Sequence, residues 1–520
     1  MKVTDVTRSN LIGGEMLNWS DLHPGDARPA AAGPAATALL AAALTPEDAV
    51  LLAGPHAAEL VEAVASQVAS VDLLVRSAPD AEELADLLTT TKAQVFCGSL
   101  DRFPLGEADA ARGAGAAKGV SGAGAAGSGY DVVVALDGLE RLVGPDTAGF
   151  SWAEGLERLV GLLRPGGRLL LGATNSFGFE RLIQPDITAA IPRDEDWGRN
   201  AADRPPAGLK PLTTVLQAAL GTAGVSRPAA GTCETSADVP DLGGAGAGEA
   251  TRGGGVRVYG VFPSLVQAEV AFTSVDGFAG VVAAQAVAAR NDGPVLMDPY
   301  RVVLDAAEAG IALELAPAWY YVIGAEPPTV LPEGVVPEGD GVLLEEHLLT
   351  ALRCDDQAEL RRVIPQYVAW LGAGGAGSPD NVILDGGSYR LFGERQDLDV
   401  VGHLRRFAGR VLAGGGRVPW PAAADAHQLT GRLAAMAGIT VPEPEFTPDE
   451  VVRPRGSAEQ LQTVARLADE LADASARAIL FEGTVSGIRR SRPYRVGHAV
   501  LNPARVVRRR IKRVLKKVRR

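Results

Sequence analysis

Polar side chains that could contact a ligand follow two apolar segments in the middle of the sequence. Asp137 and Glu140 come shortly after the β-branched segment 130–136, and Asn175 ends a second apolar segment, 168–175. Continuous apolar runs of this length are typical of strands buried on both faces of a parallel sheet. In open α/β sheets, ligands bind outside the carboxyl ends of such strands. We therefore expect these three side chains to lie at a ligand-binding edge.

The surrounding sequence predicts the helices and strands that would position this edge. Residues 151–163 begin with a serine that can cap a helix and then place apolar residues three and four apart. Pro165-Gly166-Gly167 would end that helix and turn the chain into the next strand. Upstream, strands are predicted at 49–54, 71–77 and 93–101, with helices at 56–69 and 79–90. Such alternation predicts a parallel sheet with right-handed crossovers.

The order of these features resembles the fourth and fifth strands of class I S-adenosylmethionine-dependent methyltransferases. The matching features are YDVVVAL followed by D-x-L-E-x-L, the amphipathic helix, LRPGG at 163–167 and the apolar strand after it. The resemblance covers a little over half of the chain. It implies an α/β fold with a Rossmann-like seven-stranded mixed sheet over about 40–326, and a methyltransferase that uses S-adenosyl-L-methionine. Segments 256–264, 269–274 and 317–326 would supply the last strands.

The resemblance also implies which residues would bind the cofactor. In the family, glycines follow the first strand because the backbone must approach the cofactor closely, and an acid ends the second strand. Here Gly54 is the one glycine of the first loop, Pro55 and His56 follow it, and the second strand ends in Arg76-Ser77. The implied cofactor-binding residues are Ala53, Gly54, His56, Ser77, Ser99, Asp101, Leu136 and Asp137; Glu140 and Asn175 would face the acceptor, and no catalytic base is implied.

The altered first loop leaves alternatives open. One is a catalytically inactive methyltransferase-like scaffold. Another is NADP binding, because some Rossmann enzymes place a basic residue like Arg76 against the 2′-phosphate. The first turn lacks GxGxxG, so pyrophosphate binding is unsupported, and we expect Arg76 to be salt-bridged or solvated instead.

Composition bounds the compartment and the metal chemistry. The chain has 520 residues, a net charge of −13 and three cysteines, Cys97, Cys233 and Cys354, far apart and without metal-ligand spacing. This predicts a reducing, cytoplasmic environment and no metal site. No apolar run approaches membrane-spanning length, and the first residues lack the apolar core of a signal peptide.

Composition also predicts the domain organisation. Gly/Ala-rich insertions interrupt the methyltransferase-like domain, a Pro/Gly-rich linker follows it, and a smaller, mainly helical accessory domain comes next. The predicted ranges are 1–39 for an N-terminal extension, 40–326 for the methyltransferase-like domain with flexible inserts at 106–129 and 234–255, 327–343 for the linker, 344–482 for the accessory domain and 483–520 for a basic tail. Predicted accessory helices span 344–354, 357–372, 397–413, 424–437 and 457–480, with a hairpin turn at 385–387.

The tail differs in charge from the rest of the chain. Residues 489–520 carry fourteen Lys and Arg and no acid, and after Asn502-Pro503 apolar residues recur at helical spacing. A basic amphipathic helix suits an anionic membrane surface, which predicts peripheral association with the inner membrane face. Nucleic acid, bound through phosphate contacts, is the alternative partner. The chain as a whole further resembles methyltransferase-like proteins of bacterial surface-polysaccharide clusters, which implies a small-molecule or glycan acceptor and a role in polysaccharide biosynthesis.

Overall fold

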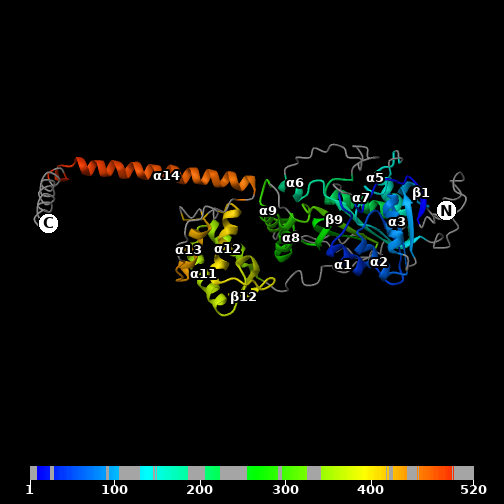
Figure 1. The fold of residues 1–520 in the computed structure, drawn as a ribbon, viewed down its shortest axis with the longest axis horizontal. Helices are drawn as coiled ribbons and strands as arrows, with labels where there is room; N and C mark the ends of the chain where they lie inside the picture. Colours follow the sequence, from blue (N-terminus) through cyan, green and yellow to red (C-terminus); the bar gives the residue numbers. More distant parts are fainter. Residues whose placement is uncertain are drawn as a thin grey trace, which may run out of the picture. The chain divides into compact units, whose positions relative to one another are not determined.

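The structure is a computed structural model of the chain (Figure 1). The residues that it describes are 9–23, 28–88, 93–104, 129–144, 147, 149–184, 205–222, 255–290, 295–324, 341–416, 418–420, 425–441, 454, 456–494 and 496. Most of the predicted inserts and linker, and most of the basic tail, lie outside these residues. The chain divides into two compact units, Met1–Leu348 with Tyr367–His403 and Leu349–Gln366 with Leu404–Arg520. The domain boundaries predicted from composition stay a prediction.

A mixed sheet forms the centre of the first unit. Its strand order is β1-β4-β3-β2-β5-β6-β9-β7-β8. Neighbouring strands from β1 to β6 are parallel, and those from β6 to β8 are antiparallel. The strands are β1 (Asn10–Gly13), β2 (Ala49–Ala53), β3 (Ser70–Val75), β4 (Ala93–Gly98), β5 (Tyr130–Ala135), β6 (Leu163–Thr174), β7 (Val256–Ser264), β8 (Gln267–Phe272) and β9 (Ala318–Ile323).

The predicted α/β class with a large mixed sheet is confirmed. The predicted count of seven strands was wrong, since the described residues alone form a sheet of nine. Strand β1, which was not predicted, lies at one edge beside β4, and β8, which overlaps the predicted segment 269–274, lies at the other edge beside β7. The sequence NLIG of β1 is too short for its pattern to predict a strand, and its pairing with β4 is a tertiary contact.

Helices cover both faces of the sheet (Figure 1). Alternate residues of one strand belong to opposite cores, so Val133 packs with one set of helices and Val134 with the other. One core includes residues of α5 (Trp152–Gly161), α6 (Phe179–Ile183), α7 (Leu209–Thr222), α8 (Gly277–Arg290) and α9 (Pro299–Glu308). The other includes residues of α1 (Pro34–Ala43), α2 (Ala58–Gln67) and α3 (Ala78–Leu87).

The turn predicted at Pro165-Gly166-Gly167 lies inside β6. The pairing of β5 with β6 shifts register there, between Tyr130 and Val132, and is regular again from Arg168. Gly166 has φ +81, a left-handed conformation that favours glycine. Pro165-Gly166-Gly167 therefore forms an irregularity within β6, and does not form the predicted turn between a helix and a strand.

The first unit also contains a small antiparallel sheet of β10 (Val342–Leu343), β11 (Val382–Asp385) and β12 (Ser388–Leu391). The 3-10 helix η3 (Pro379–Asn381) comes directly before β11. The predicted hairpin turn is confirmed, because Asp385 pairs with Ser388 across Gly386-Gly387. The remaining helices are η1 (Leu100–Arg102) in the main domain and α10 (Leu344–Arg353), α11 (Gln357–Gly372), α12 (Val400–Ala413), α13 (Ala426–Met436) and α14 (Ser457–Arg490). Helix α14 runs ten residues beyond its predicted end. Among the helices that the structure describes, none combines the length and the apolar composition that crossing a membrane requires.

Candidate functional site

The carboxyl ends of the parallel strands bring most of the predicted site residues to one edge of the sheet. Gly54 follows β2, Ser77 follows β3, Ser99 follows β4, Asp137 follows β5 and Asn175 follows β6. Because these strands are parallel and adjacent, their ends share an edge. The geometry at this edge decides which polar groups could meet a ligand.

Ala53 and Leu136 contribute only backbone to this edge, because both side chains are fully buried in the two hydrophobic cores. The Leu136 carbonyl also lies against β6, where a Cβ added to Gly172 would be 1.8 Å from its oxygen. This close approach explains a glycine within β6. The side chains of Ala53 and Leu136 are therefore part of the core, and only their backbone could face a ligand.

His56 is a buried cross-link between the first loop and the end of β5. Its Nδ1 lies 3.0 Å from the Gly54 carbonyl oxygen, and its Nε2 accepts a hydrogen bond from the Leu136 N–H at 3.2 Å. The side chain is 2% exposed, and burial lowers its pKa. The imidazole is therefore neutral, with Nδ1 as the donor and both nitrogens engaged by backbone.

A segment far upstream lies against the same loop. The Ala57 N–H donates to the Ala31 carbonyl at 2.9 Å, and the Ala31 N–H donates to the Pro55 carbonyl at 3.4 Å. Gly54 adopts φ +92 here, as the lone glycine of the loop. The backbone of residues 53–57 is thus paired with residues of the N-terminal segment.

Asp137 is completely buried and bound by two arginines. Arg141 reaches both carboxylate oxygens, with its Nε 2.7 Å from one and its Nη2 2.6 Å from the other. Arg28 donates to Asp137 as well, at 2.7 Å from Oδ2 and 3.0 Å from the carbonyl. Arg141 also donates to the carbonyls of Arg28 and Pro29, at 2.8 and 2.7 Å. The acid predicted to meet the cofactor therefore holds residues 28–29 against the sheet.

Arg76 forms the second buried ion pair of the edge. Its Nε and Nη2 donate to the two oxygens of Asp21 at 2.8 and 2.9 Å, and its Nη1 donates to the Val143 carbonyl at 3.1 Å. Only 2% and 3% of the two side chains is exposed. Burial opposes the ionisation of Asp21, but the hydrogen bonds and charge of Arg76 outweigh it and lower the pKa of this carboxyl. The prediction that Arg76 would be salt-bridged is confirmed.

Ser77 and the acid that follows it hold the same upstream segment. The Ser77 hydroxyl donates to the Trp19 carbonyl at 2.6 Å and accepts from the Asp80 N–H at 3.2 Å, which caps helix α3. Asp80 accepts from the Ser20 hydroxyl at 2.5 Å and from the Asp21 N–H at 2.7 Å. Ser77 is therefore a helix cap and an anchor for residues 19–21.

Ser99 and Asp101 are joined by a threonine that the sequence did not single out. The Thr147 hydroxyl lies 2.6 Å from the Ser99 hydroxyl and donates to Asp101 at 3.1 Å, while the Gly144 N–H donates to Ser99 at 3.1 Å. Asp101 also pairs with the exposed Arg102 at 3.2 Å. These contacts order the loop after β5 beside the end of β4.

The two predicted acceptor-facing residues differ in their surroundings. Asn175 donates to the carbonyls of Glu314 and Ala316, both at 2.9 Å, and accepts from the Phe177 N–H at 3.0 Å. Its amide therefore ties the end of β6 to the chain before β9. Glu140 is half-buried and folds back over Gly138, where an added Cβ would lie 2.4 Å from its Oε2.

Residues 14–23 and 28–32 thus form a cover, here called the N-terminal cover, over the carboxyl ends of β2 to β5. They supply the partners that sequence reasoning missed, Asp21 and Arg28. The pairing of Arg141 with Asp137 could have been predicted, because the two residues are four positions apart in the sequence. The polar groups predicted to hold S-adenosylmethionine are satisfied by this cover or by nearby loops, so they do not fit the cofactor as they stand. The described residues also contain no group of three or more His, Cys, Asp and Glu side chains placed to bind a metal ion.

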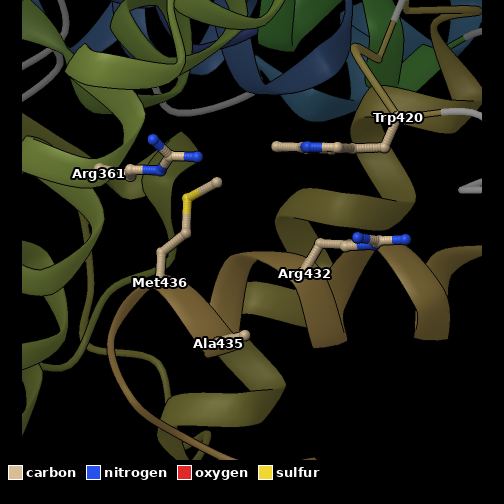
Figure 2. Close-up of a pocket in the computed structure, with 5 residues that line it drawn as sticks. All are labelled: Arg361, Trp420, Arg432, Ala435 and Met436. Carbon is tan, nitrogen blue, oxygen red and sulfur yellow. The ribbon is translucent and has the colours of Figure 1, made fainter.

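A separate hollow of about 470 Å³ lies in the second unit (Figure 2). Two arginines and a tryptophan contribute to its lining, and Figure 2 shows the Trp420 ring above the guanidinium of Arg432. Both arginines are exposed. The lining residues are Arg361, Trp420, Arg432, Ala435 and Met436. None of them was predicted to belong to a site.

Comparisons with known proteins add fold similarity at low identity. No family model and no curated protein matches this chain. Among solved structures, the cyclase SpnF is 14% identical with a TM-score of 0.26, over 56% of this chain and 78% of its own. The methyltransferase CcbJ from Streptomyces caelestis is 20% identical with a TM-score of 0.20, over 33% of this chain and 61% of its own.

The N-methyltransferase NodS from Bradyrhizobium japonicum WM9, in complex with S-adenosyl-L-homocysteine, is 13% identical with a TM-score of 0.20, over 33% of this chain and 65% of its own. This chain spans about half the length of two further matches, 51% of a protein from Bacillus halodurans and 50% of the YcgJ protein from Bacillus subtilis. TM-scores this low assign no family to this chain.

Proposed function

We propose that this chain is an S-adenosylmethionine-dependent methyltransferase whose cofactor edge is closed by the N-terminal cover. The observation that carries the proposal is the sheet itself: six adjacent parallel strands, from β1 to β6 in the sheet order, followed by the antiparallel β9 and β7. Such a sheet offers a ligand edge where its parallel strands end. When bound, the cofactor would supply the methyl group, and the protein would contribute mainly alignment of donor and acceptor.

Under this proposal the cover must move before the cofactor binds. Its contacts are of two kinds: the Arg76–Asp21 pair is buried, whereas the Arg28 side chain is 37% exposed beside Asp137. Arg28 is partly exposed, and Asp137 would keep its two contacts with Arg141 if Arg28 left, so no buried charge would be unpaired. The part of the cover around Arg28 is therefore the part that opens at least cost. Opening there would remove the Arg28 contact from Asp137, which Arg141 still holds, and would uncover the backbone beside His56.

A second candidate is a catalytically inactive methyltransferase-like scaffold. The observation that favours it is His56, whose two nitrogens are both engaged by backbone at the point where the family has glycines. A histidine and a proline at this position fill space next to the strand ends, and both are buried.

Isothermal titration calorimetry of the purified chain with S-adenosylmethionine and S-adenosylhomocysteine tests the proposal. The methyltransferase predicts saturable binding of both compounds. Absence of heat for either, from protein whose circular dichroism shows it to be folded, would favour the scaffold. Adenosine serves as a control, because binding of adenosine alone would indicate a nucleoside site without methyl-donor recognition.

The acceptor is a finer proposal, which rests on the sequence resemblance alone. We propose that the acceptor is a small molecule or a surface glycan precursor. Residues 489–520 would hold the enzyme at the inner membrane face, where such a precursor would be met. Co-sedimentation of the full chain with anionic vesicles, against a chain lacking 489–520, tests the membrane part. Retention of RNA in place of vesicles would contradict it.

A further inference from the structure

Helix α14 carries an apolar seam that is exposed along its whole length. The helix has 34 residues, and none of them is buried. Its six large seam side chains are 42% to 70% exposed. The seam residues, three and four apart in strict alternation, are Val464, Leu467, Leu471, Ala474, Ala478, Phe481, Val485 and Ile488.

This alternation is the a and d pattern of a heptad repeat. All eight a and d positions from 464 to 488 are apolar, and they span about 37 Å of helix. Apolar residues every 3.5 positions keep a narrow stripe facing one partner helix when two helices supercoil. The wider apolar face of a membrane-surface helix does not require this strict period.

We propose that α14 pairs with α14 of a second copy of this chain as a parallel two-stranded coiled coil. This inference is independent of the proposed function. A parallel pair places each g position opposite the e position five residues further along the partner. Arg477 is at g and Glu482 is at e, so the two-fold axis produces two Arg–Glu pairs.

The remaining contacts of this kind are compatible with the same register. They are Thr463 with Ala468, Glu470 with Ser475 and Thr484 with Arg489, and none of them brings like charges together. In an antiparallel pair g faces g and e faces e, which would not join Arg477 to Glu482. The charges therefore favour the parallel orientation.

Pairing would also stabilise this exposed helix. Gly483 and Gly487 lower its intrinsic helix stability, and helices gain most of their stability by packing an apolar face. Both glycines lie outside the seam, at f and c. Ala474 and Ala478 at the centre of the seam allow two backbones to approach closely.

A matched pair of substitutions tests the seam. Ala478→Glu places a charge at an a position, and Ala476→Glu places the same charge at the solvent-facing f position two residues away. Light scattering of the full chain after size exclusion should give twice the 53.8 kDa chain mass for the wild type. We expect Ala478→Glu to weaken association at least about tenfold, because like charges would face each other, and Ala476→Glu to leave it unchanged.

The orientation is tested by disulfide formation in Ala474→Cys. Identical d positions face each other only in the parallel pair, so oxidation should yield a covalent dimer. The wild type, oxidised in the same way, is the control for its own cysteines, which include the exposed Cys354, and we expect it to stay without this link. A monomer at all concentrations, or equal effects of the two glutamate variants, would overturn the proposal. So would a monomer that binds vesicles through Ile479 and Leu480, which lie off the seam and are 70% and 71% exposed. A dimer without the disulfide would overturn the parallel orientation.

Discussion

Arg76→Met tests whether the N-terminal cover is held by a buried ion pair. The substitution keeps the apolar stem of the side chain but removes the guanidinium and its two hydrogen bonds of 2.8 and 2.9 Å to Asp21. Asp21 then remains 3% exposed, with a Trp19 donor at 3.0 Å and Arg141 at 3.8 Å. Removing one partner of a buried pair costs about 3–5 kcal/mol, because the other charge is left uncompensated.

Since Arg141 still lies near Asp21, we expect a loss at the lower end of this range, about 3 kcal/mol. Urea unfolding at pH 7 measures the loss for the first unit. Hydrogen exchange measures it locally, since the Met16 N–H donates to the Arg76 carbonyl and the Asp21 N–H donates to Asp80. A loss of 3 kcal/mol corresponds to exchange about a hundredfold faster where local opening limits it.

The double variant Asp21→Leu/Arg76→Met is the control. Replacing both charges by apolar groups of similar volume is often neutral, so it should recover most of the loss. The pair would not hold the cover if the single variant cost under about 0.5 kcal/mol, the usual range of a surface substitution. A double variant as unstable as the single one would show that packing rather than charge is responsible.

Three further substitutions test local claims. The free energy of unfolding of the wild type should fall as the pH drops below about 6.5, because burial lowers the pKa of His56 and the unfolded chain therefore takes up the proton first. His56→Gln should show a smaller fall, and pH profiles that run parallel for the two proteins would contradict this. Gly172→Ala should cost at least about 3 kcal/mol in urea unfolding, since the new Cβ would lie 1.8 Å from the Leu136 oxygen, and a cost near zero would refute the close approach. Ser151→Ala should cost about 1 kcal/mol, because it removes the capping box with Glu154; no change in unfolding midpoint would argue against the cap.

The strands of the sheet were predictable where burial on both faces left a continuous apolar run. Segments 130–136 and 168–175 match β5 and the regular part of β6. Helix α8 was missed, because its repeated Ala and Val side chains give a weak amphipathic contrast. Strand β1 was missed because four residues carry too little pattern. The central strands, whose carboxyl ends form the candidate site, were therefore easier to predict than the outermost strand β1.

The position of the candidate site could be predicted from the sequence, but the residues that bind its polar side chains could not. Parallel strand ends bring Ser77, Ser99 and Asp137 together, as their positions after strands indicated. What satisfies them depends on residues that lie far off in sequence, such as Asp21, which is 55 residues from Arg76. A buried arginine at a strand end requires a carboxylate, but local sequence does not identify which one.

Calorimetry of S-adenosylmethionine with the wild type and Arg28→Ala tests most directly whether the covered edge is a cofactor site. Arg362→Ala is the matched control, since it also removes an exposed arginine from a carboxylate, with Glu359, in the second unit. If the cover competes with the cofactor, Arg28→Ala should bind about fivefold more tightly than the wild type, which corresponds to about 1 kcal/mol for the loss of one contact to an Asp137 that Arg141 still pairs. Arg362→Ala should match the wild type. Absence of binding by all three folded proteins would contradict the account.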